Sequence, residues 1–98
     1  MNVNINSVHF KTDRNLDNFI EKKIHKLSGF HEGVMDSEVT LKLDNSETKE
    51  NKISEIRLLL KGEELFAKKQ SRTFEEAVDL AVNALKKQIE KHKERYSK

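Results

Sequence analysis

Basic side chains are concentrated at the C-terminal end of this 98-residue chain, at the spacing of a helix surface. The segment that starts at Lys86 holds six lysines or arginines and two glutamates, whereas the whole chain has a net charge of +2. Its cations fall on two adjacent helical rows, with Lys87, Lys91 and Arg95 in one and Lys86 and Lys93 in the other. Cations so arranged can meet successive phosphates and release counterions, which indicates nucleic acid first and an acidic membrane surface second.

The same charges also fit a solvated helix face, since lysine and glutamate are good helix formers. Glu90 and Glu94 offer pairing partners within the segment. A second basic group, Lys22, Lys23 and Lys26, lies on another predicted helix. If both helices pack on one side of a sheet, this group flanks the C-terminal one, and a lysine-lined groove between the helices would suit a folded RNA. A third group adds to the count: Lys68, Lys69 and Arg72.

The residue types give little indication of catalysis, metal binding or a phosphate-binding loop. The chain has no cysteine, and its three glycines are dispersed rather than gathered in a phosphate-binding loop. The four histidines lack the spacing of a zinc site, and no pair of acidic residues suggests a general acid and base. We therefore expect no enzyme, no metal, no cofactor and no small-molecule substrate. Phe30 and Phe66 are expected to be packing residues, although they could stack on bases.

Two kinds of periodicity predict the elements that position these residues. Apolar residues at helical spacing follow a possible N-cap at Thr12 or Asp13, and a second helical stripe follows Thr73, whose capping box is completed by Glu76. Alternating apolar residues predict strands, and Gly62 is placed in a tight turn between two of them. The expected elements are a strand over 3–10, a helix over 13–28, strands over 34–43, 55–60 and 65–70, and a long helix after residue 73.

This order predicts an α+β domain of the form β-α-β-β-β-α, in which two helices pack on one face of a four-stranded sheet. Leu58 and Leu85 are expected in the core, and Ala77 and Ala81 would let the long helix approach the sheet closely. There is no apolar run of transmembrane length and no signal peptide, so we expect a cytoplasmic protein without a membrane partner.

One stretch of the long helix resembles a known family. The segment Leu85-Lys86-Lys87-Gln88-Ile89-Glu90-Lys91-His92-Lys93 is similar to the last helix of the ribosome hibernation promoting factors, also known as ribosome-associated inhibitors or sigma-54 modulation proteins. Lys23, Lys26 and Leu27 resemble the family's first helix, and the order of elements agrees along the whole chain. Thr73, Glu75 and Ala84 depart from the family's usual residues.

The resemblance implies a factor that binds the small ribosomal subunit in the channel of mRNA and tRNA near the decoding centre. Occupancy of that channel would stop translation in idle cells. The rRNA contacts implied by position, with Lys22 and Arg95 added from helical geometry, are Lys22, Lys23, Lys26, Lys86, Lys87, Lys91, His92, Lys93 and Arg95.

The resemblance further implies a single ribosome-binding domain over 1–98, without the C-terminal dimerisation domain of long family members. This short form would depend on a separate protein to bring ribosomes together. Two alternatives remain open at this point. A sheet backed by two basic helices also resembles a generic double-stranded RNA-binding module, and the older family name suggests an interaction protein that acts on a sigma factor.

Overall fold

The computed structural model describes residues 2–30, 33–44 and 49–96, and the side chains of all of these except 92–96. It confirms the expected order of elements. The elements are β1 (Asn2–Ser7), α1 (Arg14–Ser28), β2 (Val34–Leu43), β3 (Lys52–Leu60), β4 (Glu63–Ser71) and α2 (Phe74–Tyr96).

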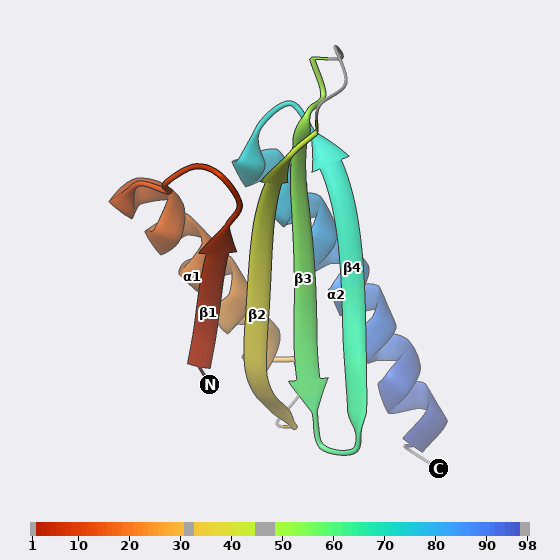
Figure 1. The fold of residues 1–98 in the computed structure, drawn as a ribbon. Coiled ribbons are helices and arrows are strands. Elements are labelled where there is room, and N and C mark those ends of the chain that lie inside the picture. The colour runs from red at the N-terminus through yellow and green to blue at the C-terminus, as the bar shows by residue number, and fades with distance from the viewer. Residues whose placement is uncertain (1, 31–32, 45–48, 97–98) are drawn as a thin grey trace.

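The four strands form one sheet in the order β1-β2-β3-β4. β1 runs parallel to β2, and the other neighbours are antiparallel. α1 packs on β1 and β2, while α2 packs on β3, β4 and α1. Figure 1 shows both helices on the same face of the sheet and running in the same direction. The predicted fold is therefore confirmed, and no helix among the described residues lies on the other face of the sheet.

Both helices begin at the predicted caps. The Asp13 carboxylate accepts a hydrogen bond from the backbone N–H of Leu16 at 2.7 Å, and the Thr73 hydroxyl accepts one from the N–H of Glu76 at 3.0 Å. Each bond satisfies one of the N–H groups that a helix leaves without a partner in its first turn. The short connections before α1 and α2 are thereby fixed, which sets where each helix starts along the sheet.

β1 ends at Ser7, three residues before the predicted limit of that strand. His9 has a positive φ of 65°, and the Ser7 hydroxyl donates to the carbonyl of Phe10 at 2.6 Å, so the backbone turns away from the sheet. The ring of Phe10 then stacks on that of Phe74, with centroids 4.9 Å apart. The alternation through Phe10 predicted a strand up to residue 10. Local periodicity could not show that Phe10 stacks on Phe74, which is distant in the sequence.

An irregularity in β2 explains why its apolar residues change phase. The pairing of β2 with β3 shifts between Val34 and Asp36, as in a β-bulge, and the intervening Met35 is exposed. Val34 and Val39 can then both be buried, although they are an odd number of residues apart. At the same end of β3, Gly62 has a φ of 79° in the turn to β4, as its predicted place in a tight turn requires.

The core lies between the helices and one face of the sheet. Leu58 and Leu85 are fully buried there, as predicted, and so are Ala77 and Ala81 of α2. Small side chains on this stripe let the backbone of α2 lie close to β3 and β4. The other buried hydrophobic residues are Ile20, Ile24, Leu27, Val34, Val39, Leu41, Ile56, Leu60, Leu65, Ala67, Val78, Val82 and Ile89.

Candidate nucleic-acid interface

The basic residues predicted on the two helices lie on the helix-bearing side of the molecule. Lys22 and Lys26 are exposed and one turn apart on α1, and Lys87 and Lys91 are exposed and one turn apart on α2. Since α1 and α2 run in the same direction, their lysine-rich C-terminal halves point toward the same end of the molecule (Figure 1). The fold thus places cations that are about 60 residues apart in sequence on the same side of the sheet.

Lys23 of α1 and Lys86 of α2 lie where the two helices face each other. The ammonium group of Lys23 forms an ion pair with Asp79 of α2 at 2.9 Å and also lies over the ring of Phe19. The ammonium group of Lys86 lies 4.5 Å from the centroid of the Phe30 ring, just beyond the end of α1. Both contacts connect the two helices. These two cations therefore help to hold α1 against α2, and Lys23 shares its charge with a carboxylate.

Lys87 and Lys91 lie on the opposite side of α2, beside β4. Together with Lys69 of β4 they line a shallow groove of about 480 Å³, which we call the three-lysine groove. Lys69 lies two residues after Ala67 and four after Leu65, both of which are buried under the helices. Because every second residue of a strand points to the same face, Lys69 also projects on the helix-bearing side. The complete lining is Lys69, Leu80, Asn83, Ala84, Lys87, Gln88 and Lys91.

A hydrogen bond between the elements fixes the shape of this groove. The side-chain amide of Gln88 donates to the backbone carbonyl of Phe66 at 2.9 Å, which fastens α2 to the edge strand β4. Phe66 is on an edge strand, so its carbonyl would otherwise be open to water or to another strand. The bond keeps α2 at a constant distance from β4, and the two walls of the groove are held in place before any ligand arrives.

Several lysines on this side are not engaged in ion pairs within the described part of the chain. Among the described side chains, no ion pair involves Lys22, Lys26, Lys69, Lys87 or Lys91. Unpaired surface cations on one side of a small protein produce a positive potential that attracts polyanions over several ångströms. The arrangement can therefore bind an extended anion such as a nucleic-acid backbone without first breaking internal contacts.

Three predicted contact residues cannot be compared with the structure in the same way. His92, Lys93 and Arg95 belong to α2, but their side chains lie outside the described residues. The helix backbone nevertheless continues through them, so Arg95 follows Lys91 by one turn and Lys93 follows Lys86 by two. Their predicted role as rRNA contacts stays a prediction.

The structure corrects two expectations about neighbouring residues. Lys68 does not add to the same surface as Lys69, because adjacent strand residues point to opposite faces; its ammonium group lies 3.9 Å from Glu55 on the helix-free face. Phe30 and Phe66 are not core packing residues, since they are 39% and 47% exposed. Phe30 instead stacks against Lys86, and Phe66 lies on the helix-free face of β4.

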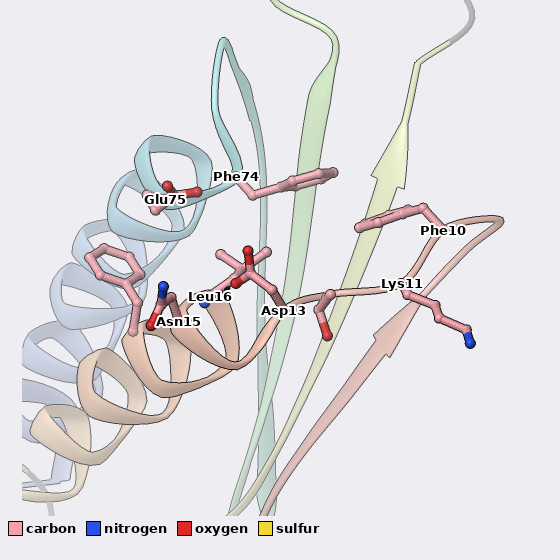
Figure 2. Close-up of a pocket in the computed structure, with 9 residues that line it drawn as sticks. Phe10, Lys11, Asp13, Asn15, Leu16, Phe74 and Glu75 are labelled. Carbon is pink, nitrogen blue, oxygen red and sulfur yellow. Dashed lines mark hydrogen bonds between the residues drawn. The ribbon is translucent and has the colours of Figure 1, made fainter.

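A separate pocket lies at the other end of the helices, and Figure 2 shows it between the start of α1, the start of α2 and the connection that follows β1. It has a volume of about 570 Å³ and is lined by Phe10, Leu16, Phe19 and Phe74 with Asp13, Glu75 and other polar residues. None of the predicted contact residues lines it. The stacked rings of Phe10 and Phe74 join the end of β1 to the start of α2 there.

Several groove residues are absent from the predicted rRNA contacts, although Lys69 was counted in the third basic group: Lys69, Leu80, Asn83, Ala84 and Gln88. Strand alternation from Leu65 through Ala67 was the signal that could have directed Lys69 to the helix-bearing side. Leu80 lies off the buried stripe of α2, and nothing in the sequence distinguishes it from a leucine exposed by chance. Its place beside Lys69 depends on how α2 packs against β4.

The fold and the site define a class: a small α+β domain whose two helices, on one side of a four-stranded sheet, present lysines without ion-pair partners among the described side chains. Comparison with known proteins identifies the family of this domain. Residues 3–97 match the family model described as "Sigma 54 modulation protein / S30EA ribosomal protein". The chain is 31% identical over 93 residues to the ribosome hibernation promotion factor of Bacillus subtilis (strain 168), covering 95% of this chain and 49% of that protein.

Solved structures share the fold. A ribosomal subunit interface protein from Coxiella burnetii has a TM-score of 0.83 at 22% identity, covering 95% of this chain and 98% of that one. The N-terminal domain of Thermus thermophilus Protein Y has a TM-score of 0.81 at 22% identity, covering 94% of this chain and 99% of that one. The chain belongs to the Sigma 54 modulation protein / S30EA ribosomal protein family. It spans about half the length of its curated relative.

The structure adds one finding on membranes. Within residues 2–30, 33–44 and 49–96, no helix is both long enough and apolar enough to cross a bilayer. α2 is the longer of the two helices, and its exposed face carries glutamates in the first turn and lysines toward the other end.

Proposed function

We propose that this chain is a ribosome-binding domain that inhibits translation by occupying the small ribosomal subunit. It would bind rRNA in the channel of mRNA and tRNA near the decoding centre, and act in the cytoplasm of idle cells. Its role is steric, so it requires no catalytic residue, metal or cofactor. The single observation that carries the proposal is the set of unpaired lysines that both helices present on one side of the fold.

Family membership supports the identity of the target. The curated relative is a ribosome hibernation promotion factor, and one of the similar structures is a ribosomal subunit interface protein. Within this proposal, Lys22, Lys26, Lys87 and Lys91 contact phosphates directly, since they are exposed and unpaired among the described side chains. Lys23 and Lys86 contribute charge and also position the helices through Asp79 and Phe30. His92, Lys93 and Arg95 extend the same surface along α2.

Cosedimentation with isolated small subunits and with intact ribosomes tests the proposal. We expect saturable binding near one copy per small subunit. The affinity should fall steeply across a salt series, because contacts to phosphates release counterions. Initiator tRNA and mRNA added together should displace the protein if it occupies their channel.

Two results would contradict the proposal in different ways. If the protein fails to sediment with ribosomes at low salt, ribosome binding itself is wrong. If it binds but initiator tRNA does not displace it, the proposed location in the channel is wrong. A short generic RNA duplex serves as the control competitor. Displacement by that duplex at concentrations similar to the subunit concentration would favour a general double-stranded RNA-binding module.

A further inference from the structure

The three-lysine groove contains more than a phosphate-binding surface requires. Leu80 is 41% exposed and lies in the groove with Ala84, so part of the lining beside the three lysines is apolar. Asn83 and Gln88 add side-chain amides to the lining. A single exposed leucine on a protein surface is common, but this one lies within a concave site that cations surround. The lining thus combines apolar contact, amide groups and positive charge.

We infer that the three-lysine groove receives the base of an unpaired RNA nucleotide, while Lys69, Lys87 and Lys91 bind the phosphates on either side of it. The inference rests on the proposed function, because it names the RNA feature that the basic surface selects. The volume of about 480 Å³ falls within the range of roughly 300–1,000 Å³ that is typical of small-ligand sites. A single nucleotide fits a site of this kind, because its base has an apolar face and its phosphates are negatively charged.

The shape of RNA explains why the nucleotide must be unpaired. In an A-form duplex the bases are stacked and paired, and the narrow major groove keeps side chains from their edges. A base can lie on Leu80 and Ala84 only if it is turned out of the stack, as in a bulge or a loop. The amide of Asn83 can then donate to or accept from an exposed base edge. Lys87 and Lys91, about 6 Å apart along the helix axis, remain free for adjacent phosphates.

The other half of the basic surface lacks this combination. On the side of α2 that faces α1, Lys23 is paired with Asp79 and Lys86 is covered by the ring of Phe30. Figure 1 shows that α1 and α2 lie beside each other on that side, whereas the opposite side of α2 borders the edge strand β4. Selection for an unpaired base is therefore assigned to the groove beside β4 and not to the helix pair.

Three RNA duplexes test the inference by fluorescence anisotropy with the full chain at low salt. The first carries a single-nucleotide bulge, the second an abasic bulge with the same phosphates, and the third no bulge. We expect wild type to bind the base-bearing bulge about fivefold more tightly than the abasic one, the factor for removing roughly 40 Å² of apolar surface from water. Equal affinities for these two probes would overturn the inference.

Three variants locate the effect. Leu80→Ser should abolish the preference for the base while leaving affinity for the abasic probe unchanged. The matched control is Leu59→Ser, since Leu59 is 43% exposed on the helix-free face and should keep the preference. Lys69→Gln should weaken binding of both bulged probes by the same factor. Retention of the preference in Leu80→Ser would overturn the assignment to this groove.

Ribosome binding, measured separately, distinguishes this inference from the proposed function. A protein that sediments with small subunits but does not distinguish base from abasic bulge supports the function and overturns the groove assignment. A base preference without ribosome binding supports the groove and overturns the ribosomal target. Competition by a poly-glutamate peptide as strong as that by the bulged RNA would overturn the inference in favour of an acidic protein partner.

Discussion

The two sides of the sheet carry similar kinds of charged residues but arrange them differently. On the helix-free face, Lys42 and Lys68 both contact Glu55, at 3.2 and 3.9 Å, and Arg57 contacts Glu64 at 2.6 Å. On the helix-bearing side, the ion pair of Lys23 with Asp79 stands beside exposed lysines that have no acidic partner among the described side chains. Cations are thus compensated on one face and available on the other.

Geometry accounts for part of this difference. Residues on neighbouring strands stand directly opposite one another, as Glu55 does with Lys68 and Thr40, so oppositely charged pairs form across the sheet. Helices instead separate charges along their length. α1 and α2 have acidic residues in the first turn, where negative charge is favourable, and lysines follow further along. The number of basic residues on a face therefore does not show how many of them are available to an anion, because ion pairs already engage some of them.

Adjacent residues of β3 give the largest expected difference between the two faces. Leu58 is fully buried under the helices, whereas Leu59 is exposed on the helix-free face. Leu58→Ala should lower the free energy of unfolding by about 2–5 kcal/mol, because it removes buried methyl groups and leaves a cavity. Leu59→Ala is the matched control and should change it by less than about 0.5 kcal/mol. Urea unfolding of both variants measures this, and similar losses would show that both faces of the sheet are covered in solution.

Matched pairs of lysines give the second difference. Lys87→Gln combined with Lys91→Gln should weaken binding to small subunits about 10- to 100-fold and reduce the salt slope by about 1.4 to 1.8, since two phosphate contacts are lost. Lys42→Gln combined with Lys68→Gln removes the same charge from the helix-free face and should change the affinity by no more than about twofold. Cosedimentation over a salt series compares them, with thermal unfolding to confirm that both fold. Equal losses would mean that net charge, and not the helix surface, determines binding.

The sequence was sufficient for the fold because each local signal agreed with the tertiary structure. Asp13 and Thr73 cap the helices as predicted, and Gly62 turns the chain between β3 and β4. The predictions failed where a distant partner decided the outcome. β1 ends early because Phe10 meets Phe74, which periodicity over 3–10 cannot reveal.

The candidate site shows the same division. The rows of lysines on α1 and α2 follow from helical spacing, and so does their exposure. Their separation into a paired group near Asp79 and an unpaired groove near Lys69 does not, because it depends on the rotation of α2 between α1 and β4. The contact of Phe30 could not be predicted for the same reason, since its ring lies against Lys86 of another element and not in the core.

Two ion pairs, one on each side of the sheet, provide the smallest and most discriminating comparison. The pair of Lys23 with Asp79 joins two helices and its side chains are 29% and 46% exposed, whereas Arg57 and Glu64 are 56% and 50% exposed at the surface of the sheet. Water screens the second pair more strongly despite its shorter distance. Double-mutant cycles with Lys23→Gln and Asp79→Asn should therefore give a coupling energy of about 0.5–1 kcal/mol, and those with Arg57→Gln and Glu64→Gln about 0–0.3 kcal/mol.

The cycle also separates position from charge at the proposed interface. Asp79→Asn removes a negative charge from the helix surface, which by itself should strengthen binding to small subunits. If the ion pair positions α1 against α2, the variant loses that gain in part, and Lys23→Gln with Asp79→Asn together should bind no better than wild type. A coupling near zero in stability, with tighter binding in Asp79→Asn alone, would show that Lys23 acts only as a charge and that the helices hold their arrangement through the apolar core.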